Sequence, residues 1–141
     1  MTRFERLDVA GRRVFVRVDF NVPLQEGAVS DDARIRAALP TIENLIDRKA
    51  KVVLGSHLGR PKGQLVDALS LEPVASRLAE LLDHQVTFIS DSIGEDVQAV
   101  LGLQQPGDVI LLENLRFHPG EKAHDTAYAE SLMQGMDLYV N

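Results

Sequence analysis

The sequence contains no cysteine and no long apolar run. Without cysteine, disulfide bonds and thiolate chemistry are excluded. The apolar runs, such as residues 109–112, have the length of a strand and fall well short of the ~18 apolar residues of a transmembrane helix. Residues 1–6 lack the apolar core of a signal peptide. We therefore expect a cytoplasmic protein that does not enter a membrane.

Basic residues are also scarce relative to acidic ones. The chain has 15 Lys and Arg against 21 Asp and Glu, which gives a net charge of -6. Sequence-independent binding of nucleic acid favours a broad basic surface, so we expect no nucleic-acid partner. Of the 15 basic residues, 11 are arginine, whose planar fork can hold phosphate or carboxylate through two hydrogen bonds. Any anion site should therefore be local and rich in arginine.

The chain has the length and composition of one globular domain spanning residues 1–141, with 45% hydrophobic and 26% charged residues. Short, almost continuous apolar segments predict strands that are buried on both faces, at 13–20, 51–56, 86–90, 109–114 and 138–140. Apolar spacing predicts helices at 33–49, 71–83, after Gly94 and at 126–133. We expect Pro40 to kink or restart the first helix and Ser70 to cap the second. This order predicts an α/β fold with a three-layer, doubly wound parallel sheet.

The chain stops directly after the last predicted strand, at Asn141. A natural α/β domain seldom ends at the mouth of a strand, so we expect a fragment of a longer protein. The final strand would then leave an uncovered edge, through which the fragment is expected to self-associate.

Two polar residues, Asp19 and Asn21, follow the first predicted strand, and Arg34 opens the helix after it. Ligands of open α/β sheets bind beyond the carboxyl ends of the strands, where these residues should lie. A cation at a helix start opposes the helix dipole, so Arg34 needs another partner. Two other readings stay open here: Asn21 can serve a simple turn, and Arg34 can form a surface pair with Asp31 or Asp32.

The segments after the second and fourth strands add cations at the same edge. Residues 56–63, with the sequence SHLGRPKG, combine His57 and Arg60 with glycines that let the backbone approach a ligand. The segment is not a Walker P-loop, because the required spacing is absent, and a flexible basic turn remains an alternative. Arg116 follows the fourth strand. Clustered cations repel one another unless an anion joins them, so the sequence predicts a small ligand with phosphate or carboxylate groups.

Four ordered segments together resemble the phosphoglycerate kinase family, namely VRVDFNVP at 16–23, DARIRAALPTI at 32–42, SHLGRPKG at 56–63 and LLENLRFH at 111–118. The resemblance covers essentially the whole chain and is to the amino-terminal, substrate-binding domain. It implies a Rossmann-like half of a monomeric, two-domain, hinge-bending kinase. This glycolytic enzyme reversibly transfers a phosphoryl group from 1,3-bisphosphoglycerate to ADP and gives 3-phosphoglycerate and ATP.

The resemblance also implies roles for single residues. Asp19 and Asn21 would hold the glycerate portion, and Arg34 would be the catalytic arginine, contacting the carboxyl group and the phosphoryl group in flight. The residues that would hold the phosphate that is not transferred are His57, Arg60 and Arg116. Those that would contribute mainly backbone groups are Phe20, Leu58 and Gly59. Mg-ADP and Mg-ATP would bind to a second domain that this chain lacks, so we expect no metal or nucleotide site here and no activity from the chain alone.

Two competing interpretations remain at this point. One is a non-catalytic α/β module that binds a phosphorylated metabolite, which phosphoryl-transfer assays on the full-length gene product would distinguish. The other is a signalling receiver domain with Asp19 as its phosphorylated aspartate, although the final strand offers no lysine beside that position. Labelling of Asp19 by acetyl phosphate would favour the second.

Overall fold

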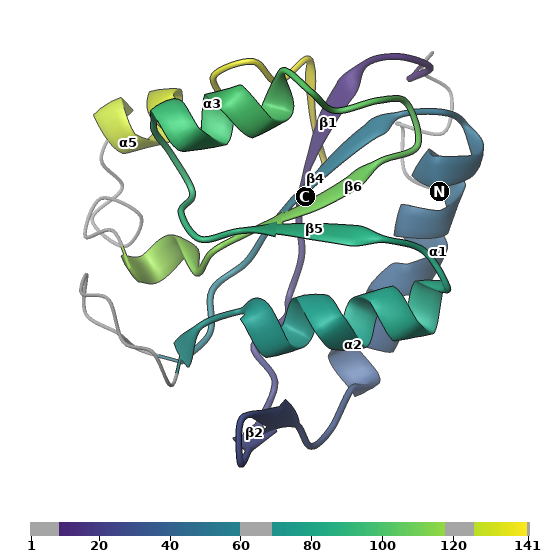
Figure 1. Ribbon diagram of the computed structural model, residues 1–141, viewed down its shortest axis with the longest axis vertical. Helices are drawn as coiled ribbons and strands as arrows, with labels where there is room; N and C mark the ends of the chain where they lie inside the picture. The colour runs from purple at the N-terminus through teal and green to yellow at the C-terminus, as the bar shows by residue number, and fades with distance from the viewer. Residues whose placement is uncertain (1–8, 60–68, 118–125, 141) are drawn as a thin grey trace.

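The five apolar segments predicted as strands pair with one another in a single sheet (Figure 1). This computed structural model describes residues 9–59, 69–117 and 126–140. The strands of the main sheet are β1 (Arg13–Arg17), β4 (Lys51–Gly55), β5 (Val86–Ile89), β6 (Val109–Leu112) and β7 (Leu138–Val140). Their order across the sheet is β5-β6-β4-β1-β7, and each pairing is parallel. The predicted parallel sheet is confirmed.

Four of the five strands end one to three residues earlier than the apolar pattern predicts. After β1, the Val18 N–H still donates to Gly55 O at 3.0 Å. The regular backbone pairing with β4 ends at Phe20, because the Phe20 N–H donates to the hydroxyl of Ser56 at 2.9 Å instead of to a strand carbonyl. The chain therefore leaves the sheet while its side chains are still apolar and buried, as Phe20 is.

Helices cover both faces of the sheet, so the predicted three-layer arrangement is confirmed (Figure 1). One face is covered by α1 (Ala33–Asp47) and α2 (Glu72–Leu82), and the other by α3 (Glu95–Leu101) and α5 (Thr126–Leu132). The side chains of β1 alternate between the two cores. Val14 and Val16 pack with α1 and α2, whereas Phe15 packs with the core beneath α3. Burial on both faces explains the almost continuous apolar strands.

Two details of the predicted helices differ in the structure. Pro40 lies inside α1, which runs as one helix, because burial of Ile35, Ile42 and Leu45 holds its two halves on the same face. The predicted restart at Pro40 is therefore wrong, whereas the alternative of a kink stays a prediction. Helix α2 begins one residue later than predicted, with Leu71 at the N-cap position. Ser70 does not occupy that position, although its hydroxyl still accepts a hydrogen bond from Glu72 N at 3.2 Å.

The connection between β1 and α1, for which the sequence predicts neither helix nor strand beyond residue 20, contains a small antiparallel hairpin. Its strands are β2 (Leu24–Gln25) and β3 (Ala28–Val29). The two turn residues, Glu26 and Gly27, have φ values of 52° and 76°, as a type I′ turn requires. Strands of two residues leave too short an alternation for the sequence pattern to show.

The last strand, β7, is an edge strand that pairs with β1 on one side. Tyr139 is 53% exposed, and its ring stacks on that of Phe15, with the ring centroids 5.7 Å apart. Pairing of this edge with another chain stays a prediction. Among the described residues, no helix has the length and apolar character needed to span a bilayer.

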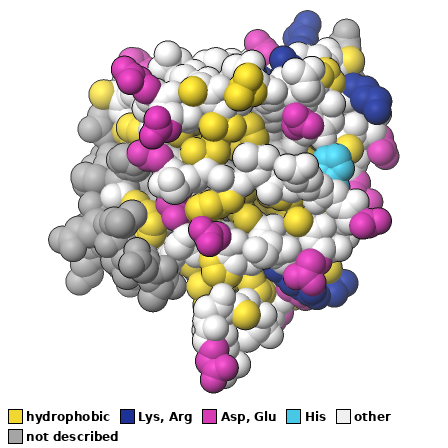
Figure 2. Space-filling view, viewed as in Figure 1, with side chains coloured by type: hydrophobic (Ala, Val, Ile, Leu, Met, Phe, Trp, Pro, Cys, Tyr) yellow, Lys and Arg dark blue, Asp and Glu magenta, His cyan; other side chains and the backbone are white. Residues whose placement is uncertain are grey.

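Charge is unevenly distributed over the face that carries α2 and β5 (Figure 2). Acidic side chains are scattered across this face, while the Lys and Arg side chains visible there gather at its right margin. As far as the described residues show, this face has no broad basic patch, in keeping with the net charge of -6.

Candidate functional site

Three segments that the sequence places far apart meet at the carboxyl edge of the sheet. Arg34, in the first turn of α1, donates from Nη1 to the backbone oxygen of Asn21 at 2.6 Å and to Asp19 Oδ1 at 3.4 Å. The side chain of Asn21 reaches the turn after β4, where its Oδ1 accepts a hydrogen bond from Gly59 N at 2.9 Å. Asp19, Asn21, Arg34 and Gly59 therefore form one connected cluster, which we call the strand-end cluster.

The charged members of the strand-end cluster are open to solvent. The side chains of Arg34 and Asp19 are 55% and 64% exposed. Both contacts of Arg34 use the same nitrogen, and within the described part of the chain its Nε and Nη2 have no partner. A guanidinium group that is bound through one nitrogen can still donate hydrogen bonds from its other two nitrogens, for example to a carboxylate or phosphate oxygen.

The alternative in which Arg34 pairs with a neighbouring aspartate is wrong. Asp31 instead accepts a hydrogen bond from the backbone N–H of Ala33 at 3.0 Å. Asp32 binds Arg36 of the same helix at 2.9 Å and Arg77 of α2 at 2.7 Å. These two contacts, of which the hydrogen bond from Arg36 is the stronger influence, hold the pKa of the Asp32 carboxyl below its ordinary value.

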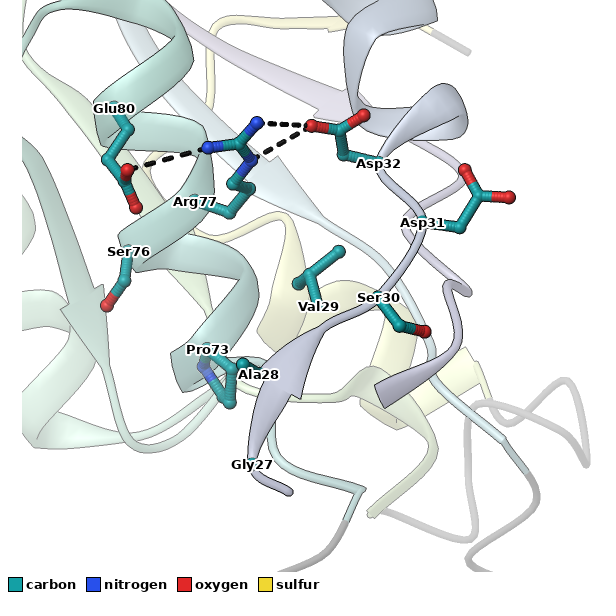
Figure 3. A pocket seen from close by; sticks show the side chains of 10 residues that line it. All are labelled: Gly27, Ala28, Val29, Ser30, Asp31, Asp32, Pro73, Ser76, Arg77 and Glu80. Carbon is teal, nitrogen blue, oxygen red and sulfur yellow. Dashed lines mark hydrogen bonds and ion pairs between the residues drawn. The ribbon is translucent and has the colours of Figure 1, made fainter. Parts of the chain in front are cut away.

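A hollow of about 660 Å³ lies between the β2–β3 hairpin and α2 (Figure 3). Its walls are residues 27–32 and the α2 residues Pro73, Ser76, Arg77 and Glu80. All three guanidinium nitrogens of Arg77 face carboxylates, two toward Asp32 and one toward Glu80 at 3.5 Å. An arginine satisfied in this way does not offer an anion site, and none of the residues predicted to bind substrate lines the hollow.

The remaining predicted site residues lie around the same edge with different exposure. Phe20 and Leu58 are buried, so they present mainly backbone, as expected of them. His57 is half-buried and lies two residues after the end of β4. Arg116 is also half-buried and is the middle residue of the short 3-10 helix η3 (Leu115–Phe117), which follows β6. Arg60 lies outside the described residues. The structure therefore gathers most of the predicted residues at one edge, and their contact with a substrate stays a prediction.

Sequence reasoning missed three buried polar residues beneath this edge, because it searched for cations. Ser56, Glu113 and Asn114 are 0%, 6% and 1% exposed. A signal was available, since Glu113 and Asn114 follow the apolar run at 109–112 without any intervening turn residue. A carboxylate and an amide at the end of a strand buried on both faces must find hydrogen-bond partners inside the protein.

The family model and the similar sequences that match this chain all belong to one family. The family model described as "Phosphoglycerate kinase" matches residues 4–141. The chain is 58% identical over 134 residues to a phosphoglycerate kinase of Rippkaea orientalis, covering 95% of this chain and 34% of that protein. It is 53% identical over 135 residues to a phosphoglycerate kinase of Moorella thermoacetica, covering 96% and 34% of the two chains.

Solved structures agree with the sequence comparison. A crystal structure of phosphoglycerate kinase from Pyrococcus horikoshii superposes with a TM-score of 0.86 at 38% identity, covering 100% of this chain and 36% of that one. The structure of the Coxiella burnetii phosphoglycerate kinase gives 0.82 at 37% identity, covering 94% and 33%. The chain thus spans about a third of the length of these relatives. Since the family model extends over almost every residue and the fold agrees throughout, the chain belongs to the phosphoglycerate kinase family.

Proposed function

We propose that residues 1–141 form part of the amino-terminal, 3-phosphoglycerate-binding domain of a phosphoglycerate kinase. The reaction is reversible transfer of a phosphoryl group between 1,3-bisphosphoglycerate and ADP, a step of glycolysis in the cytoplasm. The nucleotide, as its magnesium complex, is proposed to bind outside this chain, so the chain alone should not catalyse the transfer. The observation that carries the proposal is the strand-end cluster, in which Arg34 is held by Asp19 and Asn21 yet keeps two nitrogens without a partner among the described residues.

Arg34 is the proposed catalytic residue. In phosphoryl transfer, a protein mainly positions the reactants and neutralises the charge on the transferred group, and no nucleophilic side chain is required. The hydrogen bond from Nη1 to Asn21 O fixes one corner of the guanidinium group. The nitrogens Nε and Nη2 are then available to the carboxyl group of the substrate and to the phosphoryl group in flight. Because the group is held before substrate arrives, little of its freedom remains to be lost on binding.

Asp19 and Asn21 are proposed to hold the glycerate portion of the substrate. The Asp19 carboxylate can accept a hydrogen bond from a substrate hydroxyl. The hydrogen bond from Gly59 N assigns Oδ1 of Asn21 as the acceptor, which leaves the Nδ2 hydrogens for a substrate oxygen. His57, Arg60 and Arg116 are proposed to bind the phosphate that is not transferred, with backbone support from Phe20, Leu58 and Gly59. The full-length enzyme is expected to act as a monomer.

The decisive test compares two arginines of the same helix in the full-length gene product. Arg34→Ala should lower turnover by a factor on the order of 10³ or more, because charge on the transferred group loses its neutralising partner. Arg36→Ala is the matched control, since Arg36 lies two residues away, has 56% side-chain exposure against 55% for Arg34, and pairs with Asp32 instead. Its turnover should stay close to that of the wild type. Equal losses in both variants, or normal turnover in Arg34→Ala, would contradict the assignment.

A second test separates binding from catalysis. Arg60→Ala should mainly weaken substrate binding, since its proposed partner phosphate does not react. Calorimetric titration of 3-phosphoglycerate into the 141-residue chain should show heat of binding that the Arg60→Ala variant loses. Identical titrations for wild type and variant would remove Arg60 from the proposed site.

A further inference from the structure

The carboxyl edge of the sheet contains a buried hydrogen-bond network that the proposed substrate contacts do not use. Its members are the side chains of Ser56, Glu113 and Asn114, all almost completely removed from solvent. Burial of such groups is unfavourable unless each finds a partner, and among the described residues no buried side-chain polar atom lacks one. The network therefore has a defined geometry, and the geometry indicates what it does.

Asn114 joins three separate points of the backbone. Its Nδ2 donates to Leu58 O at 2.8 Å and to Leu69 O at 2.9 Å. Its Oδ1 accepts a hydrogen bond from Arg116 N at 3.0 Å. One amide thus contacts the residue before Gly59, whose N–H binds Asn21, and the backbone of Arg116. The strand ladder makes neither connection, because β4 and β6 end at Gly55 and Leu112.

Glu113 holds Asn114 in place and caps the neighbouring helix. Its Oε1 accepts hydrogen bonds from Asn114 N and Leu71 N, both at 2.8 Å. Its Oε2 accepts one from the hydroxyl of Ser70 at 2.7 Å. A carboxylate at the start of α2 is favoured by the helix dipole and by the unpaired N–H groups of the first turn. This tertiary cap also explains why Ser70 donates its hydrogen to a residue 43 positions away.

Ser56 connects the same region to the loop after β1. Its hydroxyl accepts a hydrogen bond from Phe20 N at 2.9 Å, and its backbone oxygen accepts one from Leu115 N at 2.9 Å. Phe20 stands between Asp19 and Asn21 of the strand-end cluster. Hydrogen bonds from buried side chains thus connect the loops after β1, β4 and β6 beyond the carboxyl ends of the strands.

We propose that Asn114 is a positioning residue for substrate binding. Its amide fixes the turn at Leu58 and Gly59 relative to the segment that carries Arg116. This inference rests on the proposed function, which places the phosphate that is not transferred between these segments. Loss of the amide leaves two carbonyl oxygens without a donor and lets the two segments separate, so the phosphate should be held less tightly while the reacting atoms are less affected.

Gln104 provides a control for a purely structural role, because it makes the same kind of bridge at the opposite edge of the sheet. It is 4% exposed, and its Nε2 donates to Val52 O at 2.9 Å and to Asp108 O at 3.1 Å. Like Asn114, it is a buried amide that joins the chain at β4 to the chain at β6. It lies at the amino end of these strands, away from every residue of the strand-end cluster.

The experiment compares Asn114→Ala and Gln104→Ala in the full-length gene product. Both variants should unfold at lower denaturant concentration. Asn114→Ala should in addition raise the KM for 3-phosphoglycerate by about tenfold or more, with the KM for ATP changed by less than about twofold. Gln104→Ala should leave both KM values within about twofold of the wild type. Similar KM values for 3-phosphoglycerate in the two variants would overturn the proposal.

Two further variants keep the test decisive. Asn114→Ser retains one hydrogen-bond donor in case the alanine variant does not fold, and it should still raise the same KM severalfold. Glu113→Gln retains the acceptor for Leu71 N and Asn114 N, so it should preserve the KM for 3-phosphoglycerate. A large increase in this KM would show that the charge of Glu113, and not the position of Asn114, matters.

If the wild type turns over without any dependence on 3-phosphoglycerate, the proposed function and this inference both fail. Normal kinetics in Asn114→Ser would overturn the inference alone.

Discussion

The two edges of the sheet use arginine in opposite ways. At the amino edge, Arg13 opens β1 and commits all three side-chain nitrogens to the protein. Nε donates to Gln104 Oε1 at 3.1 Å, Nη1 to Gly135 O at 3.0 Å and Nη2 to Leu101 O at 2.5 Å. At the carboxyl edge, Arg34 engages one nitrogen and leaves the other two without partners among the described residues. The residue type is the same, and only the count of satisfied donors separates a structural arginine from one available to a ligand.

The largest effect on stability is expected at the amino edge. Arg13→Ala leaves Gly135 O and Gln104 Oε1 without a donor and removes one of the two donors to Leu101 O, which still accepts a hydrogen bond from Gln104 N. The loss should lower the free energy of unfolding by about 2–4 kcal/mol. The neighbouring exposed residue supplies the control, since Arg12→Ala should change it by less than about 0.5 kcal/mol. Urea denaturation measures both. A small loss in Arg13→Ala would remove the distinction between the two edges.

The packing beneath the carboxyl edge gives the next prediction. A Cβ atom at Gly55 would lie 2.5 Å from Phe15 Cζ and 3.3 Å from Leu115 Cδ1. Gly55→Ala should therefore lower the free energy of unfolding by about 1–3 kcal/mol through overpacking. At Gly102, a Cβ would make contacts of 3.5 Å or more, and Gly102→Ala should be neutral or slightly stabilising. Equal thermal unfolding midpoints for the two variants would contradict the tight packing of Phe15 and Leu115 around Gly55.

A smaller effect is expected from the ion pairs of Asp32, and it should depend on pH. Arg36 and Arg77 lower the pKa of this carboxyl in the folded state from its ordinary value of 3.8. The stabilisation is therefore complete above the unfolded pKa and is lost as pH falls through the folded pKa. Asp32→Asn should lower the unfolding midpoint at pH 6, and the difference from wild type should disappear in the acid range, below about pH 4. A difference that is constant down to the acid range would show that the carboxyl does not titrate in this way.

The smallest effect on stability is expected for the residue with the largest proposed effect on turnover. The pair between Arg34 and Asp19 is exposed on both sides and 3.4 Å long. Arg34→Ala should change the free energy of unfolding by about 0.5 kcal/mol or less, as measured by urea denaturation. A larger loss would mean that Arg34 is a structural arginine like Arg13, and the comparison between the edges would fail.

The local pattern of apolar residues was sufficient to place all five main strands and the helices between them. It failed where a contact distant in sequence overrides the pattern. Ser70 is displaced from the N-cap position where Glu113, 43 residues away, caps α2. Pro40 was expected to kink or restart a helix that burial on one face keeps continuous. Hairpin strands of two residues are too short to carry any period.

In the candidate site, too, some features follow from the local sequence and others from contacts between distant residues. The sequence by itself determined the fold class, the family resemblance and the gathering of Asp19, Asn21 and Arg34 at a strand end, because strand period and loop position are local properties. Only the tertiary structure decided that Arg34 binds Asn21 and not Asp32. It also decided that a buried amide reaches from Asn114 to Leu58 across 56 residues. Such contacts depend on strand order and on the requirement that every buried polar group finds a partner, and neither is written in the sequence around a single residue.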